Sequence, residues 1–228
     1  MARIAAACRR VGRDPSEIQL VAVSKTVPPE RLRAAVSAGL TTLAENRVQE
    51  LAEKAAVLPG VTWHLVGHLQ ANKARSALGV ASVIHSVDSL DLAQRLDRLL
   101  EGGPGPADEA LALGVPRAVY LQVNVDADPA KAGFAPAALA ALLPELAALP
   151  RLHLAGLMTV GRLVATPEAA RPTFVALRAL SETLRTRAAW LGPGLSMGMS
   201  DDFEVAVEEG ATIVRVGRAI FGERPPAA

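Results

Sequence analysis

The sequence predicts an α/β fold: a single (β/α)8 TIM barrel with one extra helix at its N-terminus. Short apolar runs of strand length alternate with longer segments of helical periodicity through the chain. Such alternation is typical of a parallel sheet with helices on its faces. Eight such units in 228 residues come close to the roughly 250 residues of a typical barrel. A doubly wound open sheet is the alternative fold.

Eight apolar runs are predicted as the strands of the barrel. They are nearly continuous rather than alternating, as expected for strands that are covered on both faces. Prolines bound the first run, because Pro15 precedes it and Pro28 and Pro29 follow it. The predicted strands are residues 18–24, 41–44, 63–66, 81–86, 118–125, 152–158, 195–198 and 212–216.

The segments between these runs are predicted as helices. The Ala- and Arg-rich start predicts an amphipathic helix that ends near Gly12, and a transit peptide is the alternative for the same composition. Residues 101–117 predict a loop on the N-terminal face of the barrel, away from any site. Residues 1–228 show no domain boundary and are expected to form one domain. The other predicted helices are residues 29–38, 45–57, 88–100, 136–149, 167–191 and 201–209, with one more from about residue 69.

The composition argues against several classes of protein. Basic residues number 24 and acidic residues 23, a net charge of +1, which argues against a nucleic-acid or acidic-membrane partner. Aromatic residues make up only 3%, so the core is expected to be aliphatic. No run approaches the roughly 18 apolar residues of a membrane span, and the expected location is the cytoplasm. The single cysteine, Cys8, excludes a disulfide within the chain and a cysteine zinc site.

The C-terminal ends of the strands are the place to look for chemistry in a (β/α)8 barrel. Lys25 follows the first predicted strand at once. It is either an ordinary charged residue at a strand exit or a Schiff-base lysine whose pKa is lowered by partial burial. Arg215 lies inside the last predicted strand, where a guanidinium is costly unless it is paired. It either forms a structural ion pair, with Glu45 as a candidate, or points a fixed cation at a ligand.

Glycine-containing segments follow the last two predicted strands. Residues 217–219 (Gly-Arg-Ala) open the final helical segment, where backbone N–H groups approach an anion closely, as in the phosphate sites of many barrels. Residues 198–200 (Gly-Met-Ser) do the same one strand earlier. Ser200 is expected to cap the next helix and to donate to a phosphate. The acidic pair at 201–202 would repel a phosphate unless both carboxylates point away from it.

The four histidines do not predict a metal site. His64 and His68 are four apart, but their spacing straddles a strand end and Gly67 rather than a helix, and no glutamate lies between them. His85 and His153 are expected to be ordinary polar residues in or near strands. Three polar residues near the ends of other strands are expected to tie down loops, namely Asn46, Asn124 and Thr159.

Several strings, spread over almost the whole chain, resemble those of one family. They are VAVSKTVP at 21–28, AENRVQE at 44–50, WHLVGHLQANK at 63–73, HSVDS at 85–89, VNVDADPAKAGF at 123–134, GLMT at 156–159 and LSMGMSDDFEVAVEEGATIVRVGRAIFG at 195–222. The last string is the most specific of them. On these motifs the chain resembles the pyridoxal phosphate homeostasis proteins, once described as proline synthase co-transcribed proteins.

The resemblance implies a single barrel like the N-terminal domain of alanine racemase, a fold type III barrel that holds pyridoxal 5′-phosphate (PLP). It implies that Lys25 forms the internal aldimine and that Arg215 faces the pyridine nitrogen. Ser200, with the backbone of Gly217 and Arg218, would hold the phosphate. Three further residues would lie beside the ring or near it, namely Asn46, His64 and Met199. The resemblance implies no metal.

The resemblance also implies what the protein does with this cofactor. A guanidinium beside the pyridine nitrogen keeps that nitrogen unprotonated, and an unprotonated ring is a poor electron sink. Racemases of this design use a tyrosine from an additional β-domain, whereas Tyr120 is the one tyrosine here and six residues follow Gly222. We therefore expect a cytoplasmic monomer that sequesters PLP without substantial turnover, with delivery to apo-enzymes as an extension of that role. A weak PLP-dependent amino-acid racemase and, after it, a class I Schiff-base aldolase are the alternatives.

Overall fold

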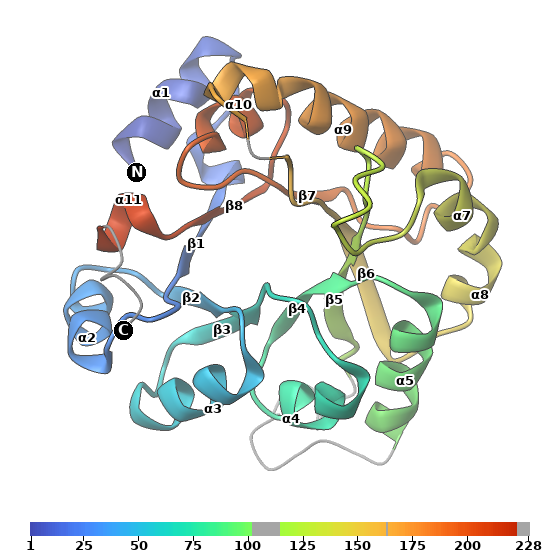
Figure 1. Ribbon diagram of the computed structural model, residues 1–228, viewed down its shortest axis with the longest axis horizontal. Coiled ribbons are helices and arrows are strands. Elements are labelled where there is room, and N and C mark those ends of the chain that lie inside the picture. Colours follow the sequence, from blue (N-terminus) through green and yellow to red (C-terminus); the bar gives the residue numbers. More distant parts are fainter. Residues whose placement is uncertain (102–114, 163, 223–228) are drawn as a thin grey trace.

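The chain folds into a closed barrel, seen in a computed structural model that describes residues 1–101, 115–162 and 164–222. Eight parallel strands follow one another around the ring in sequence order. Helices surround this ring on the outside (Figure 1). Strand β8 pairs with β1 over four positions, from Gln19 opposite Ile213 to Ala22 opposite Val216. The predicted (β/α)8 barrel is confirmed, and this pairing excludes the open sheet.

The strands are short and lie close to the predicted positions. Each pairs in parallel with the next, with register irregularities between β4 and β5 and between β5 and β6. Their bounds are β1 Gln19–Val23, β2 Thr42–Glu45, β3 Thr62–Leu65, β4 Val83–Val87, β5 Arg117–Gln122, β6 Leu152–Met158, β7 Gly194–Ser196 and β8 Ile213–Val216. The predicted loop at residues 101–117 lies mostly outside the described residues.

The helices cover the outer face of the barrel. The α-helices are α1 Ala2–Arg10, α2 Pro29–Ser37, α3 Val48–Val57, α4 Ala74–Leu78, α5 Leu90–Glu101, α7 Pro136–Ala141, α8 Leu143–Ala147, α9 Arg171–Arg185, α10 Phe203–Glu208 and α11 Arg218–Phe221. The described residues also include three short 3-10 helices, η1 Pro15–Glu17, η2 Ala71–Lys73 and η3 Pro167–Ala170.

Two predicted helices differ from the observed ones, and a proline lies at a point of difference in each. The single helix predicted at 136–149 is two helices, α7 and α8, which meet at Leu142. Pro144 lies just beyond that junction, and a proline in a helix interior lacks an N–H and clashes with the preceding turn. The long helix predicted at 167–191 is α9 preceded by the 3-10 turn η3. Pro172 stands in the first turn of α9, where a missing N–H costs nothing, and α9 ends at Arg185.

Three other predicted boundaries move by a few residues. The helix predicted from residue 45 starts at Val48, because Glu45 still belongs to β2. The helix predicted at 201–209 is the shorter α10. The helix predicted from about residue 69 begins as η2 and continues as α4.

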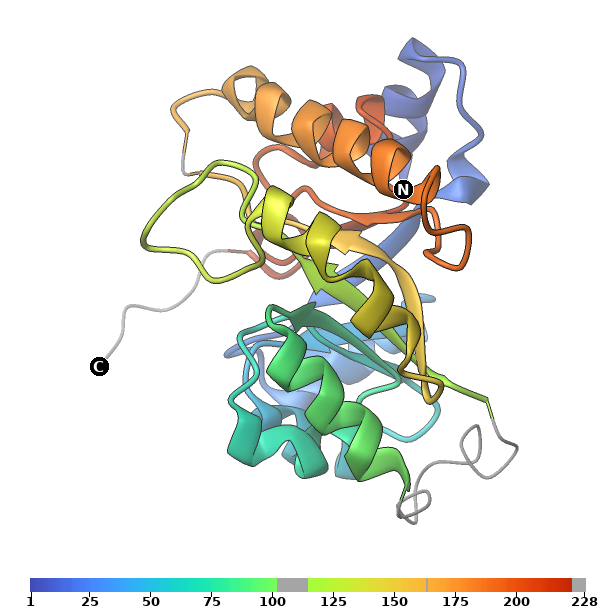
Figure 2. The ribbon, with the colours of Figure 1, turned by 90° about the vertical axis from the view of Figure 1, so that its right-hand side faces the viewer.

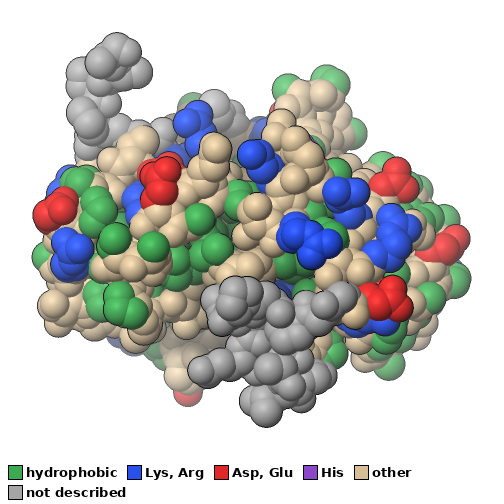
Figure 3. Space-filling view, turned by 90° about the horizontal axis from the view of Figure 1, so that it is seen from below, with side chains coloured by type: hydrophobic (Ala, Val, Ile, Leu, Met, Phe, Trp, Pro, Cys, Tyr) green, Lys and Arg blue, Asp and Glu red, His purple; other side chains and the backbone are tan. Residues whose placement is uncertain are grey.

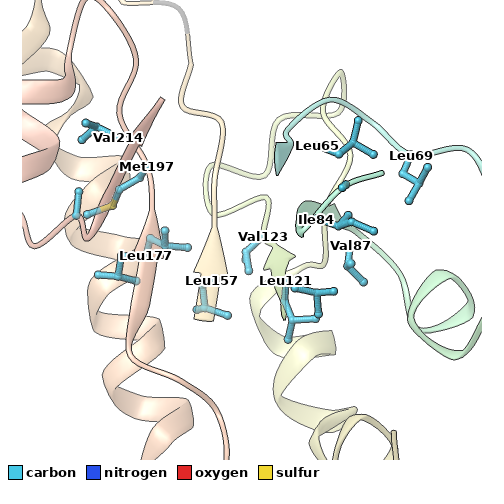
Figure 4. Packing of buried hydrophobic residues seen from close by; sticks show 14 of the residues in the cluster. Leu65, Leu69, Ile84, Val87, Leu121, Val123, Leu157, Leu177, Met197 and Val214 are labelled. Carbon is cyan, nitrogen blue, oxygen red and sulfur yellow. The ribbon is translucent and has the colours of Figure 1, made fainter. Parts of the chain in front are cut away.

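The core has two parts, one on each face of the barrel wall. The larger part lies between the strands and the surrounding helices, and it is mostly aliphatic, as predicted. Figure 4 shows residues of this layer from several strands, among them Leu65, Ile84 and Leu157, together with Leu177 from α9. The smaller part fills the lumen and consists of Val21, Ala44, Tyr120, Met158 and Ile213.

The predicted N-terminal helix is present and packs against α10, at the top of Figure 1. Arg13 donates from Nη1 to the carbonyl oxygens of Val207 (2.8 Å) and Ala211 (2.9 Å), just after α1 ends. Arg3 pairs with Glu204 of α10 at 3.2 Å. Helix α1 therefore supports the element that directly follows the residue 198–202 turn.

The face of the molecule seen from below (Figure 3) carries side chains of both charges. On the face seen in Figure 3, Lys and Arg side chains occur together with Asp and Glu. In Figure 2 the loop that follows β5 extends away from the barrel on the side where that strand ends. Within the part of the chain that the structure describes, no helix combines the length and apolar character needed to cross a membrane.

Candidate functional site

Lys25 lies at the C-terminal rim of the barrel, in the turn that follows β1. Val21 and Val23 of that strand pack in the lumen, and Lys25 comes two residues after Val23. Its side chain is partly buried. The next residue, Thr26, has a backbone φ of 64°, a left-handed conformation that costs a non-glycine residue roughly 1–2 kcal/mol. A turn with such a residue keeps its shape only where its surroundings hold it.

Three charged residues outside the barrel wall hold this turn; we call Glu45, Glu50 and Lys54 the outer clamp. Lys54 donates from Nζ to the carbonyl oxygen of Ser24 at 2.7 Å, and Oε1 of Glu50 accepts from the N–H of Thr26 at 2.8 Å. Nζ of Lys54 also lies 2.6 Å from Glu45 and 2.7 Å from Glu50. Both neighbours of Lys25 are therefore bound to the outer clamp.

The ion pair between Glu45 and Lys54 is buried between β2 and α3. The side chains of Glu45 and Lys54 are 0% and 7% exposed. Burial raises the pKa of Glu45, while the hydrogen bonds from Lys54 and from Ser24 Oγ act in the opposite direction. Charges buried in this way are costly to separate, because removing one partner leaves the other without compensation.

Arg215 reaches into the lumen from β8 and is 5% exposed. It donates from Nη1 to Oγ of Ser196 at 2.7 Å and from Nη2 to the carbonyl oxygen of Thr159 at 2.8 Å. The predicted pair with Glu45 is wrong, because Glu45 faces away from the lumen and pairs with Lys54. Both acceptors of Arg215 are neutral. Burial lowers the pKa of Arg215 to about 10, with the nearby charge of Asp202 acting in the opposite direction.

Ser200 and Gly217 are brought together by the ends of β7 and β8. Oγ of Ser200 accepts from the N–H of Gly217 at 3.2 Å and from that of Ala219 at 3.3 Å. Ser200 was expected to cap the helix that follows it, and this is wrong, because α10 has Asp202 at its N-cap position. The Ser200 hydroxyl meets the start of α11 instead. A hydroxyl and several backbone N–H groups thus converge at one place.

The two aspartates after Ser200 are both engaged. Asp201 is exposed and pairs with Arg218. Asp202 is buried, and its Oδ1 accepts from the N–H of Met199 at 2.6 Å. Burial raises the pKa of Asp202, and the hydrogen bond from Met199 lowers it. The bond from Met199 shapes the turn that places Met199 and Ser200 at the rim.

Asn46 and Met199 lie in turns whose shape depends on a glycine. The glycines are Gly67, which packs against Asn46, and Gly198, which precedes Met199. A Cβ atom on Gly67 would come within 2.2 Å of the carbonyl oxygen of Asn46, so the chain after β3 passes directly over that residue. Gly198 has a φ of 89°, and a Cβ there would lie 2.5 Å from the Cβ of Ala206. Asn46 is partly buried, as is Met199. Both residues therefore stand at the rim with Lys25.

His64 lies in the lumen and is joined to a residue that sequence reasoning passed over. His64 is opposite Ala44, a lumen residue, in the pairing of β2 with β3. Its Nδ1 is 2.9 Å from Nε2 of His85, and Nδ1 of His85 is 2.8 Å from Oγ of Ser196. Tyr120 stacks on the ring of His85 at 4.9 Å. The available signal was a histidine two residues after Val83, on the lumen side of an apolar strand.

The other polar candidates have structural contacts. Asn124 donates to the carbonyl oxygens of Asp128 (2.8 Å) and Lys131 (3.1 Å), which confirms that it ties down a loop. Thr159 does the same through Val123 at 2.9 Å. His68 is exposed and contacts Asp88 at 3.0 Å. Among the described residues no group of three or more His, Cys, Asp or Glu side chains is arranged to hold a metal ion.

Comparison with known proteins identifies the relatives of this chain. The family model for the alanine racemase N-terminal domain matches residues 2–225. A pyridoxal phosphate homeostasis protein of Aquifex aeolicus is 40% identical over 97% of this chain and 94% of its own length. One from Pseudomonas aeruginosa is 42% identical over 98% of this chain and 92% of its own. This chain belongs to the pyridoxal phosphate homeostasis protein family.

Solved structures agree with this family. PipY of Synechococcus elongatus, described with PLP bound, is 41% identical with a TM-score of 0.81, and the match covers 96% of this chain and all (100%) of PipY. An alanine racemase of Clostridium difficile is 15% identical, with a TM-score of 0.72 over 98% of this chain and 56% of the racemase. The second match shows the barrel fold alone. Members of the homeostasis family thus share their fold with part of a racemase.

Proposed function

We propose that this protein binds PLP at the rim described above and serves in PLP homeostasis, holding the cofactor without substantial turnover. Lys25 would hold the cofactor, because its Nζ is the amine that would meet the aldehyde of PLP. The observation that carries this proposal is that the barrel presents both a lysine at its rim, Lys25, and a buried guanidinium, that of Arg215. The hydrogen-bond acceptors of this guanidinium are both neutral, Ser196 Oγ and the Thr159 carbonyl.

The residues at the rim match the chemistry of PLP. A phosphate needs hydrogen-bond donors and a local positive potential. Oγ of Ser200 and the backbone N–H groups of Gly217 and Arg218 supply the donors, and Ser200 already contacts Gly217 and Ala219. PLP also carries an aldehyde, which an amine attacks, and Lys25 supplies the amine. Three residues are proposed to lie beside the ring or near it, namely Asn46, His64 and Met199.

Arg215 is proposed to face the pyridine nitrogen. Its two neutral acceptors leave its positive charge without a carboxylate hydrogen bond among the described residues. A second positive charge next to it would be unfavourable, so Arg215 would donate to the pyridine nitrogen and keep it unprotonated. The PLP ring, when bound, supplies electron-withdrawing chemistry, and this is weak in the unprotonated state. This side chain therefore favours storage of the cofactor over carbanion chemistry.

The position of Tyr120 supports the absence of turnover. Tyr120 is the only tyrosine of the chain, and it is buried in the lumen. Its hydroxyl lies next to Gly194, where β7 begins, since a Cβ atom on Gly194 would be 2.7 Å from that hydroxyl. Lys25 lies at the opposite, C-terminal end of the strands. Tyr120 is thus not placed to serve as a second acid or base opposite Lys25. A protein of this design acts as a cytoplasmic monomer that keeps a reactive aldehyde sequestered and passes it to apo-enzymes.

The deciding experiment is a visible absorption spectrum of the protein incubated with PLP, before and after borohydride reduction. The wild type should show a yellow band that reduction abolishes, and Lys25→Ala should lack it. Lys73→Ala is the matched control, because Lys73 lies in η2, which follows β3 rather than β1. Mass spectrometry of the reduced protein should place the added mass on Lys25 among the four lysines. A wild type that stays colourless would contradict the proposal and favour the aldolase.

Turnover is tested separately by hydrogen exchange at Cα of L-alanine in heavy water, with the PLP-loaded protein. We expect no exchange above that of free PLP. Exchange that depends on Lys25 would support the racemase alternative instead, while leaving the binding proposal intact.

A further inference from the structure

Four polar side chains from four strands cross the lumen in one hydrogen-bonded row. We call this row, Arg215–Ser196–His85–His64, the lumen chain. Its links are Arg215 Nη1 to Ser196 Oγ (2.7 Å), Ser196 Oγ to His85 Nδ1 (2.8 Å) and His85 Nε2 to His64 Nδ1 (2.9 Å). All four residues are 5% exposed or less. Water therefore does not compete for these hydrogen bonds.

The first link sets the direction of the row. A guanidinium has only donors, so Oγ of Ser196 must accept from Arg215. The hydroxyl then has one proton to give, and the other hydrogen bond that the described residues offer to Oγ is the one with Nδ1 of His85. A buried hydroxyl that donates to nothing costs about 1–3 kcal/mol. Ser196 therefore donates to His85, whose Nδ1 must be unprotonated.

The same logic runs through the two imidazoles. A neutral imidazole carries one N–H, so His85 with a bare Nδ1 has its proton on Nε2. That Nε2 donates to Nδ1 of His64, which must then be bare as well. The remaining proton of His64 is on Nε2. The positive charge of Arg215 favours this order too, because each ring turns its bare nitrogen towards that charge.

We infer that the lumen chain holds His64 as the neutral Nε2–H tautomer and presents a hydrogen-bond donor, not a base, to the ligand at the rim. Nε2 lies on the far side of the ring from Nδ1, and among the residues that the structure describes it has no hydrogen-bond partner. His64 thus selects for an acceptor atom on the ligand. His85 and Ser196 are positioning residues that act through His64 and Arg215.

The charged surroundings of the two histidines keep both rings neutral. Arg215 is the cation at one end of the row. Tyr120, against His85, is uncharged at neutral pH, and burial raises its pKa further. Asp202 is the carboxylate that acts on Arg215. Burial lowers the pKa of His64 to about 4, and burial, followed by the charges of His64 and Arg215, lowers that of His85 well below its usual value.

This inference bears on the racemase alternative and rests on the proposed function only for the identity of the ligand. A racemase needs a base on each side of the substrate carbon. His64 is the imidazole proposed to lie near the ring. Its Nδ1 is occupied by a hydrogen bond from His85 and its Nε2 carries a proton, so neither nitrogen can take a proton without breaking the row. The lumen chain therefore excludes His64 as a second base opposite Lys25.

The test is a nitrogen-15 correlation spectrum of histidine-labelled protein at neutral pH, recorded without PLP. His64 and His85 should each show a proton on Nε2 and a bare Nδ1. Assignments come from His68→Gln and His153→Gln, since both residues are exposed. A proton on Nδ1 of either buried ring, or a doubly protonated ring, would overturn the inference.

Two variants of Ser196 test the direction of the row. Ser196→Ala removes the donor to His85, and the Nδ1–H tautomer should then appear for His85 and His64. Ser196→Thr keeps the hydroxyl and should keep the wild-type tautomers. Unchanged tautomers in Ser196→Ala would show that Arg215 does not set them, which overturns the inference. If neither variant folds, the wild-type spectrum still decides. Because no PLP is present, failure here is distinct from failure of the yellow band to form.

Discussion

The outer clamp and the lumen chain are two buried polar clusters on opposite faces of the barrel wall. In the outer clamp, Lys54 meets two carboxylates, at 2.6 Å and 2.7 Å. In the lumen chain, Arg215 meets a hydroxyl and a carbonyl. Lys54 is hydrogen-bonded to carboxylates of the fold, whereas the hydrogen-bond acceptors of Arg215 are neutral and the charge of Asp202 acts on it without a hydrogen bond. Buried charges normally need a partner.

This difference separates support from recognition. The charges of the outer clamp neutralise one another, and its remaining hydrogen bonds go to the backbone beside Lys25. The outer clamp therefore has a structural role. The lumen chain keeps a cation that has no carboxylate hydrogen bond among the described residues, together with an imidazole N–H, and a ligand with acceptor atoms can bind to both. Breaking the first cluster should mainly lower stability, and breaking the second should mainly alter binding.

The largest effect is expected from Glu45→Ala. The substitution leaves Lys54 buried with the partly exposed Glu50 as its remaining carboxylate, and breaking a buried pair costs about 3–5 kcal/mol. Urea unfolding measures the loss. The control is Glu53→Ala, an exposed carboxylate on the same helix, which should change the free energy of unfolding by about 0.5 kcal/mol or less. Similar values for the two variants would show that the outer clamp contributes little.

The second effect is a pH dependence of the free energy of unfolding that comes from His64. Its pKa is 6.5 when unfolded and about 4 when folded, so the unfolded chain binds more protons between these values. The contribution of His64 to the free energy of unfolding is fully present above pH 6.5, and about 3 kcal/mol of it is lost as the pH drops to 4.

The comparison of wild type with His64→Gln isolates this contribution, measured as unfolding free energy against pH. Glu45 contributes an opposite slope, because burial raises its pKa, so only the difference curve is diagnostic. His153→Gln, at an exposed position, should follow the wild type. A flat difference curve would mean that His64 is accessible to protons in the folded state.

A smaller loss of stability is expected from Arg215→Met. The variant leaves the Ser196 hydroxyl and the Thr159 carbonyl without Arg215, a cost of about 1–3 kcal/mol, and it removes the positive charge that lowers the pKa of the buried Asp202. PLP binding, followed by absorption, should weaken far more than stability does. If Arg215→Met lowered the free energy of unfolding as much as Glu45→Ala does, Arg215 would have mainly a structural role.

The smallest effect on stability is expected from Glu50→Gln. The side chain is 26% exposed, so its pair with Lys54 contributes less than about 1 kcal/mol. Its Oε1 also accepts from the N–H of Thr26, and the weakened turn should lower the affinity for PLP by up to about tenfold, or 1.4 kcal/mol. Glu53→Gln is the control. Equal affinities would show that Lys25 needs no support from the outer clamp.

Much of this architecture could be predicted from local patterns. Apolar runs bounded by proline and glycine indicate the eight strands, because each strand is a local sequence feature. Helix ends were harder to place, as Pro144 shows. Whether a proline divides a helix depends on how the segments on either side of it pack, and this packing is not visible in the local sequence. The rim position of Lys25 followed from the strand that precedes it.

The partners of buried charges could not be predicted in this way. Arg215 was matched with Glu45 by charge alone, yet one faces the lumen and the other faces α3. Side chains alternate along β2, and Ala44 faces the lumen. This alternation would have shown that Glu45, the next residue, faces the helices outside. The same reasoning would have marked His85 and Ser196 as lumen residues but not as neighbours, since they lie on β4 and β7.

The sequence by itself determined the barrel, the family and the residues that end its strands, because these follow from periodicity and motifs within single segments. The tertiary structure alone decided that Arg215, Ser196, His85 and His64 form one row and that Lys54 holds the turn around Lys25. The reason is physical: which side chain faces the lumen is set by each strand, but which side chains meet across it is set only when β8 closes on β1.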